Sequence, residues 1–301
     1  MKSIKSPIRY PGAKSSSNKI IISEFIPHTS YVEVFGGSAA IFFKKEKVEH
    51  NWINDIDPNI INLFTVIRDK LDELKRMFQV GVDKQVYNIL TEEEKTSDII
   101  PFHKTVFQFI RNEYKPETDI EKAFRYYYLN RICFNGAMLY PNYSRQQASK
   151  MEKDLNKYFG DLNTASLKLK GVKLTNLDFE EVVDNCEDGS MVFLDPPYIK
   201  TEEQPRIDEL YKFAFNYEDH YRLLDVVKRN SHRLNIFITY NNVDEIKDMY
   251  SWCQRVEPKY WEYFKYTLNK EKRLKAKLNG GEELFIINYL KQSELQTRSL
   301  F

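Results

Sequence analysis

The sequence predicts an α/β protein in which a Rossmann-like, mainly parallel sheet is interrupted by a mainly helical insertion. Three observations lead to this fold class. A short apolar strand runs into a Gly-Gly turn, a helix and a second strand, which is how a parallel α/β sheet opens. Helical patterns then predominate between residues 80 and 165. After residue 170, strand patterns resume and alternate with helical ones.

The predicted strands are short apolar or β-branched runs that end at turn residues. They cover residues 31–35, 51–55, 171–176, 190–195, 234–240, 255–266 and 283–290. The first strand ends at a Gly-Gly turn, and Ser38 is the candidate cap of the helix that follows.

The predicted helices carry apolar residues at spacings of three and four. The longest begins at Pro58 and continues to Phe78. Further helices are expected at residues 101–114, 119–131, 161–169, 178–186, 217–231 and 243–250. The stretch 134–150 is polar and rich in loop-forming residues. We therefore divide the chain into a sheet-forming domain, residues 1–67 and 166–301, and an inserted domain, residues 68–165.

The composition excludes several classes of protein. The 301 residues are 42% hydrophobic and 14% aromatic, so the chain can build a core and is not intrinsically disordered. Lys and Arg number 45 against 44 Asp and Glu, which limits any nucleic-acid surface to a local patch. No apolar run is long enough for a transmembrane helix or a secretory signal. The three cysteines are widely spaced, so we expect a cytoplasmic protein with no disulfide, no metal and no membrane partner.

The most specific motif is Asp195-Pro196-Pro197-Tyr198, which directly follows an apolar strand. Two prolines cannot continue a strand, because they offer no N–H to its neighbours. They form a rigid turn at the carboxyl end of the strand, where open α/β sheets bind ligands. A carboxylate, a carbonyl and an aromatic ring at this point suit an exocyclic amine on a planar ring. The alternative is an ordinary strand-ending turn with a surface tyrosine.

A second candidate site is the glycine-rich turn at residues 33–40. Such a turn lets the backbone approach a nucleoside ligand closely. Asp55 ends the next strand, about 20 residues on, where an acidic side chain hydrogen-bonds ribose hydroxyls in dinucleotide-binding folds. Together the two features predict a nucleoside cofactor. The alternative for Asp55 is the N-cap of the helix near Pro58.

Six motifs in order carry a resemblance to a known family. They are RYPGAK at 9–14, EVFGGSAA at 33–40, NDID at 54–57, YLNRICFNGAMLYPN at 128–142, DPPY at 195–198 and NGGEELFIINYL at 279–290. Together they resemble the Dam-type family (D12 class, α group) of AdoMet-dependent, N6-adenine-specific DNA methyltransferases. The resemblance implies a class I methyltransferase sheet, with S-adenosyl-L-methionine as cofactor and double-stranded DNA as substrate. The sheet-forming domain would then be catalytic, and the inserted domain would recognise the target.

The resemblance also assigns roles to single residues. Asp195, Pro196, Pro197 and Tyr198 match the catalytic motif, in which a flipped-out adenine stacks on the tyrosine. The adenine gives its N6 hydrogens to the carboxylate of Asp195 and the carbonyl of Pro196. The residues that match cofactor-binding positions are Tyr10, Lys14, Glu33, Phe35, Gly36, Gly37, Asp55, Asp178 and Asp195.

The inserted domain is expected to read DNA, because it carries amide, guanidinium and phenol groups that suit base edges and phosphates. The candidates are Asn130, Arg131, Asn135, Tyr140, Asn142 and Arg145. Dam enzymes that recognise GATC carry an arginine where this chain has Leu139. Leucine cannot make an arginine–guanine contact, so a GATC target is in doubt.

A basic segment at residues 265–277 lies between the last two predicted strands. Its candidates for phosphate contacts are Lys270, Lys272, Arg273, Lys275 and Lys277. Such contacts would make DNA binding strongly dependent on salt. The alternative is a solvated charged loop.

Three other functions stay open at this point. The first two are methyltransferases of the same fold, one that acts on RNA adenine and one that acts on protein glutamine. Glutamine enzymes carry Asn-Pro-Pro-Tyr where this chain has Asp195. A DNA-binding or cofactor-sensing relic of the fold would have no chemical reason to keep the whole set of motifs. Restriction–modification, phage and orphan methylation systems are the expected settings. A cognate restriction endonuclease is the corresponding partner, and a monomer or weak dimer is the expected state.

Overall fold

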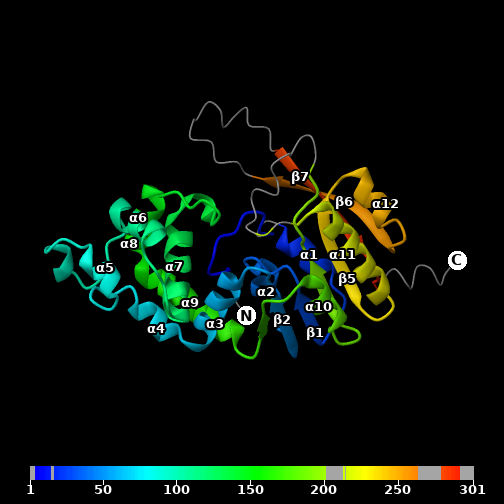
Figure 1. The fold of residues 1–301 in the computed structure, drawn as a ribbon. Coiled ribbons are helices and arrows are strands. Elements are labelled where there is room, and N and C mark those ends of the chain that lie inside the picture. The colour runs from blue at the N-terminus through cyan, green and yellow to red at the C-terminus, as the bar shows by residue number, and fades with distance from the viewer. Residues whose placement is uncertain (1–3, 15–16, 201–212, 214, 264–278, 292–301) are drawn as a thin grey trace.

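The computed structural model describes residues 4–14, 17–200, 213, 215–263 and 279–291. Its strands are β1 (Ser30–Glu33), β2 (His50–Asn54), β3 (Lys173–Thr175), β4 (Met191–Leu194), β5 (Asn235–Asn241), β6 (Arg255–Tyr263) and β7 (Asn279–Ile287). They form one sheet in the order β3-β2-β1-β4-β5-β7-β6 (Figure 1). The first five are parallel, and β7 runs antiparallel to both of its neighbours. The predicted Rossmann-like α/β fold is confirmed.

Side chains alternate between the two faces of this sheet, because successive residues of a strand point to opposite sides. Tyr31 and Phe193 belong to one hydrophobic cluster, and their strand neighbours Val32 and Val192 belong to the other. Helices α1 (Asn18–Glu24), α2 (Ala40–Lys44) and α3 (Pro58–Asp69) pack in the first cluster. Helices α10 (Phe179–Asp184), α11 (Tyr217–Asn230) and α12 (Asp244–Met249) pack in the second. The sheet is therefore the middle layer of three.

A helical lobe lies to one side of the sheet, as predicted for the middle of the chain (Figure 1). Its elements are α4 (Leu71–Arg76), α5 (Lys84–Asn88), η1 (Glu94–Thr96), α6 (Lys104–Asn112), α7 (Asp119–Ile132), η2 (Phe134–Gly136), α8 (Arg145–Lys153) and α9 (Leu155–Leu169). Helices α3 and α9 contact each other, and α3 also contacts α7 and β3. The predicted domain boundaries fall inside these two helices, which therefore join the lobe to the sheet. None of the described helices is long and apolar enough to cross a membrane.

Three local predictions were wrong. The helix from Pro58 does not continue to Phe78, because Lys70 leaves the helical region at φ −134° and a separate helix starts after it. Ser38 is not a helix cap, since the N-cap position of α2 is Ala39 and no side chain caps it. Residues 145–153 form α8 rather than a loop, and the Ser144 side chain caps it.

One buried cluster ties the N-terminal segment to the helical lobe. The Nη2 of Arg9 donates to the carbonyls of Asn130, Arg131 and Cys133 at 2.7–2.8 Å, at the end of α7. The amide of Asn130 accepts from the Arg9 N–H at 3.0 Å and donates to the Arg9 carbonyl at 2.7 Å and to that of Gly136. Cationic groups at a helix C-terminus satisfy its free carbonyls and its dipole. This cluster fixes where the loop after α7 begins.

Gly136 is the position where this cluster leaves no room for a side chain. Its φ is +71°, and a Cβ would lie 2.6 Å from the Cβ of Arg9. Gly189 has a similar φ of +78° and open space around it. Gly189→Ala should therefore cost only the left-handed backbone penalty, about 1–2 kcal/mol. Gly136→Ala should cost roughly 2 kcal/mol more, because overpacking typically adds 1–3 kcal/mol.

Urea unfolding of the two variants measures this difference directly. Equal losses of unfolding free energy would show that the segment around Arg9 yields without cost.

Candidate functional site

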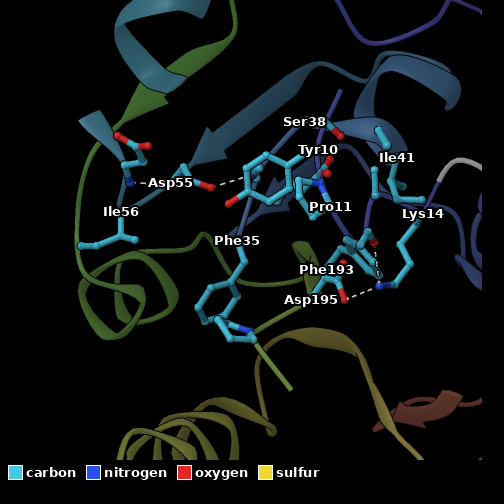
Figure 2. A pocket seen from close by; sticks show the side chains of 18 of the residues that line it. Tyr10, Pro11, Lys14, Phe35, Ser38, Ile41, Asp55, Ile56, Phe193 and Asp195 are labelled. Carbon is cyan, nitrogen blue, oxygen red and sulfur yellow. Dashed lines mark hydrogen bonds and ion pairs between the residues drawn. The ribbon is translucent and has the colours of Figure 1, made fainter. Parts of the chain in front are cut away.

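A cavity opens at the carboxyl ends of β1, β2 and β4 (Figure 2). The strand order reverses at this point, and open α/β sheets bind ligands there. Eight of the nine predicted cofactor-binding residues line the cavity: Tyr10, Lys14, Glu33, Phe35, Gly36, Gly37, Asp55 and Asp195.

The glycine turn brings backbone against the cavity. The Gly36 N–H donates to the Asn54 carbonyl at 2.7 Å, and a Cβ on Gly36 would lie 2.7 Å from that oxygen. Gly37 has φ +50°, and a Cβ there would lie 3.1 Å from the Tyr10 ring. Ala39 is the one non-glycine residue of the described chain with positive φ. Left-handed backbone in such a residue costs about 1–3 kcal/mol, and strain of this kind gathers at binding sites.

Glu33 places a fully buried carboxyl group in the cavity wall. Its Oε2 accepts hydrogen bonds from the Tyr31 hydroxyl at 3.1 Å and from the Phe42 N–H at 2.9 Å. Burial raises the pKa of Glu33 to about 8, although these two hydrogen bonds favour the ionised form. The nearby Asp195 carboxylate raises the pKa of Glu33 further, and Lys45 lowers it. A ligand with a positive charge would stabilise the ionised form of this group.

Asp55 also lines the cavity, at the end of β2. Its Oδ2 accepts from the Gly37 N–H at 2.6 Å, and its Oδ1 accepts from the Asp57 N–H at 2.8 Å. Burial raises the pKa of Asp55 to about 6. Asp57, and not Asp55, is the N-cap of α3, which removes the structural alternative for Asp55. A carboxylate has about four acceptor positions, so Asp55 can still accept from ligand hydroxyls.

Asp195 meets a buried ammonium group at the other end of the cavity. Its Oδ1 lies 2.8 Å from Nζ of Lys14, and Figure 2 shows the two side chains pointing toward one another. The same oxygen accepts from the Thr239 hydroxyl at 2.7 Å. Lys14 is only 6% exposed, and its Nζ also lies 3.5 Å from Oε1 of Glu283. Two donors thus hold one oxygen of Asp195.

The other residues of the Asp-Pro-Pro-Tyr turn lie beside Asp195. Pro197 lines the cavity and Pro196 is buried. The Tyr198 ring lies 6.0 Å from that of Tyr240, and Nζ of Lys14 lies 5.0 Å from its centroid. The turn therefore borders the cavity at Asp195 and Pro197, and at its other end the Tyr198 ring packs near the buried Tyr240 ring.

Asp178 does not line the cavity, unlike the other predicted cofactor residues. Its Oδ1 accepts from the Glu180 N–H as the N-cap of α10 and forms an ion pair with Arg222 at 2.9 Å. The resemblance therefore placed at the cofactor a residue that here caps a helix. The aromatic rings of Phe35 and Phe179 lie 5.7 Å apart on this side of the cavity.

The predicted DNA-binding residues divide into two groups. Asn130 is fully buried in the cluster with Arg9, so the prediction that its amide meets base edges is corrected. Arg131 packs its guanidinium 4.7 Å from the Tyr158 ring centroid. By contrast, Tyr140, Asn142 and Arg145 are exposed on the loop after α7 and at the start of α8.

Other predicted DNA contacts are not tested by the described structure. Asn135 lies in η2, and Leu139 follows it at a partly exposed position of the same loop. The basic candidates Lys270, Lys272, Arg273, Lys275 and Lys277 all fall outside the described residues.

Sequence reasoning missed three polar residues that hold this site. Arg9 and Glu283 belong to motifs that were noticed, but no role was given to either. Thr239 lies in an apolar strand, where a single hydroxyl gives no signal until its partner is known. Glu283 offers the one signal that could have identified it from the sequence, because it lies in an apolar strand and buried charges are rare unless they are paired.

Comparisons with known proteins agree with this geometry. The family model for D12 class N6 adenine-specific DNA methyltransferases matches residues 10–267. The type II methyltransferase M1.LlaDCHI of Lactococcus lactis subsp. cremoris is 27% identical over 73% of this chain and 77% of its own. The type II methyltransferase M.CviBI of a Paramecium bursaria Chlorella virus is 23% identical over 92% and 94%. The DNA adenine methylase of Haemophilus influenzae is 21% identical over 82% of each chain.

The raised pKa of Glu33 predicts how stability changes with pH. The pKa of Glu33 is about 8 in the folded protein, whereas a glutamate of the unfolded chain has a pKa of about 4.3. Stability therefore falls as the pH rises between these two values. Glu33→Gln removes this loss, so the variant should melt at a temperature close to that of the parent at about pH 5. It should melt a few degrees higher at about pH 8.5.

Thermal melting of the ligand-free protein and the variant over this pH range is the measurement. A difference in melting temperature that does not change with pH would contradict a raised pKa for Glu33.

Proposed function

The chain belongs to the D12 class of N6-adenine-specific DNA methyltransferases, and on that premise we propose that it methylates a flipped-out adenine at a specific DNA site. AdoMet is the proposed methyl donor. The observation that carries the proposal is the position of Asp195, which lies on the wall of the cavity and also opens the Asp-Pro-Pro-Tyr turn. One carboxylate thus faces both the cavity and the turn that suits an amine.

The acceptor groups of the cavity fit AdoMet. The carboxyl groups of buried Glu33 and partly buried Asp195 suit its positive charges, and Asp55 suits its ribose hydroxyls. Ile56, 47% exposed, and Phe35 offer apolar surface for the adenine ring. When bound, AdoMet supplies a methyl group made electrophilic by its sulfonium. We propose that these residues and the glycine turn hold it.

The Asp-Pro-Pro-Tyr turn prepares the target amine for attack. The N6 lone pair of adenine is delocalised into the ring, so the amine is a poor nucleophile. Oδ1 of Asp195 is held by Lys14 and Thr239, which leaves Oδ2 to accept one N6 hydrogen. The carbonyl of Pro196 accepts the other. Two acceptors favour a more tetrahedral nitrogen, and holding it in line with the methyl carbon supplies much of the acceleration.

Tyr198 gives the flipped adenine a surface to stack on. Flipping costs a few kcal/mol, and stacking on an aromatic ring returns roughly 1–3 kcal/mol. The Tyr198 ring lies 6.0 Å from that of Tyr240 and 5.0 Å from Nζ of Lys14, and these neighbours limit the positions that it can take. A ring held by its neighbours loses less entropy when it binds the base.

Target recognition is proposed for the exposed loop after α7 and the start of α8. Tyr140, Asn142 and Arg145 present a phenol, an amide and a guanidinium there. Their loop starts at the Arg9–Asn130 cluster. The same cluster holds Arg9, the first residue of the segment 9–14 that ends at Lys14. Because two of the relatives are type II methyltransferases, a cognate restriction endonuclease is the proposed partner.

Asp195→Ala tests the proposed chemistry. Turnover should fall by roughly 100- to 1,000-fold or more, because a contact made in the transition state is lost, while AdoMet binding weakens only partly. The measurement is methyl transfer from labelled AdoMet to unmethylated genomic DNA, with single-molecule sequencing of the product. N6-methyladenine in one sequence context would support the proposal.

Asp188→Ala is the matched control, because it removes an equal charge from an exposed carboxylate outside the cavity. It should leave turnover and AdoMet binding near those of the parent. If the parent protein binds AdoMet but leaves DNA unlabelled, the substrate is RNA adenine or protein glutamine and the proposed function fails.

Arg145→Ala tests the recognition surface. Loss of one phosphate contact should lower DNA affinity and reduce the slope of log affinity against log salt by about 1. Lys153→Ala removes the same charge from the other end of α8 and should leave the slope unchanged. Measurement of DNA affinity by fluorescence anisotropy at several salt concentrations compares the two. Equal slopes for Arg145→Ala and the parent would remove α8 from the DNA interface.

A further inference from the structure

A buried carboxyl group on β7 faces the catalytic turn, and no motif assigns it a role. Glu283 lies opposite Asn241 of β5 and Lys259 of β6 in the sheet register. The residue is only 7% exposed, and its Oε1 lies 3.5 Å from Nζ of Lys14. A carboxyl group placed this deep is costly unless it is paired or functional.

The ammonium of Lys14 joins this group to Asp195. Its Nζ lies 2.8 Å from Oδ1 of Asp195, 3.2 Å from the Gly12 carbonyl and 3.5 Å from Glu283. One cation therefore serves two carboxyl groups in a space that excludes most water. When both are ionised, the three charged side chains carry a net charge of −1. When Glu283 is protonated, the net charge is zero.

We propose that Glu283 is a positioning residue for methyl transfer: it holds the Lys14 ammonium that binds Oδ1 of Asp195, and so keeps Oδ2 of Asp195 directed at the target amine. The proposal rests on the proposed function. In methyl transfer, the N6 lone pair forms a bond to the methyl carbon, and the electron pair of the carbon–sulfur bond stays on sulfur. N6 carries positive charge until it releases a proton through Oδ2 of Asp195 to solvent. A cluster of net charge −1 stabilises the positive charge on N6. If Lys14 were paired with Asp195 only, its charge would cancel that of Asp195 and this stabilisation would be lost.

The same geometry gives the proposal a pH signature. Burial raises the pKa of Glu283 to about 7, Lys14 lowers it, the Asp195 carboxylate raises it and the Tyr198 hydroxyl lowers it. On the neighbouring strand, Lys259 is paired with Glu257 at 2.6 Å. Below its pKa the carboxyl group is neutral, so methyl transfer should slow as the pH falls. A positive ligand favours ionisation, which places this change no higher than about pH 7.

Glu283→Gln keeps the shape of the side chain and removes its charge. The single-turnover rate of methyl transfer at saturating DNA and AdoMet should fall roughly 10- to 100-fold above about pH 7. That loss is smaller than the roughly 100- to 1,000-fold expected for a direct transition-state contact. The decline that the parent shows at lower pH, in the range set by Glu283, should disappear. Affinities for DNA and S-adenosylhomocysteine should change little, because Glu283 is proposed to act on the chemical step.

Two further variants complete the experiment. Glu283→Asp keeps the charge and should recover part of the rate. Glu257→Gln is the matched control, because it removes an ion-paired carboxylate from the adjacent strand outside the cavity. It should methylate DNA at the parent rate.

Each outcome decides between the proposals. If the parent does not methylate DNA, the proposed function fails. If the parent is active and Glu283→Gln matches it in rate and pH profile, the inference about Glu283 alone is overturned. A weaker AdoMet affinity with an unchanged rate would overturn it too, because Glu283 would then belong to cofactor binding. Should the Gln variant not fold, the Asp variant decides: an acid limb that does not move to lower pH would overturn the inference.

Discussion

The carboxyl edge of the sheet depends on one buried amide, that of Asn54. Its Nδ2 donates to the carbonyls of Val34 and Leu177 at 3.0 Å. Its Oδ1 accepts from the Thr175 hydroxyl at 2.8 Å and from the Leu177 N–H at 2.9 Å. These bonds use both donors and both acceptor positions of the amide. A buried polar group satisfied in this way fixes a unique arrangement, whereas one left half satisfied would be costly.

The position of the cofactor cavity follows from this constraint. Asn54 joins the ends of β1, β2 and β3, and its own carbonyl accepts from the Gly36 N–H at 2.7 Å. The next residue is Asp55, whose carboxylate accepts from the Gly37 N–H. The glycine turn and the acidic wall are therefore held to each other through one strand end. Their spacing is set before any ligand arrives, which lowers the cost of binding.

Much of this could be read from the sequence, because its signals are local. The strand–Gly-Gly–helix order and the rigid Asp-Pro-Pro-Tyr turn identify their positions without knowledge of the fold. Two of the failures, at Asn130 and Glu283, depended on distant partners. Asn130 was predicted to contact DNA, yet its amide hydrogen-bonds the backbone of Arg9, which lies 121 residues earlier in the chain. The start of α8 was missed although Ser144 and Gln147 have the spacing of a capping box. Glu283 has its partner in the N-terminal segment.

The buried carboxyl groups at this site make the ligand-free protein less stable and favour the binding of a cationic ligand. Burial raises the pKa values of Glu33 and Asp55 in the cavity wall, and of Glu283 beside Lys14, to about 8, 6 and 7. Each shift is an energetic cost to the ligand-free fold near neutral pH. Lys14 offsets part of that cost at one end of the cavity only. A cationic ligand would favour the ionised carboxylates and release the protons they hold. The residues that destabilise the empty cavity are thus the residues that would select a positively charged occupant, so stability and binding oppose each other at the same side chains.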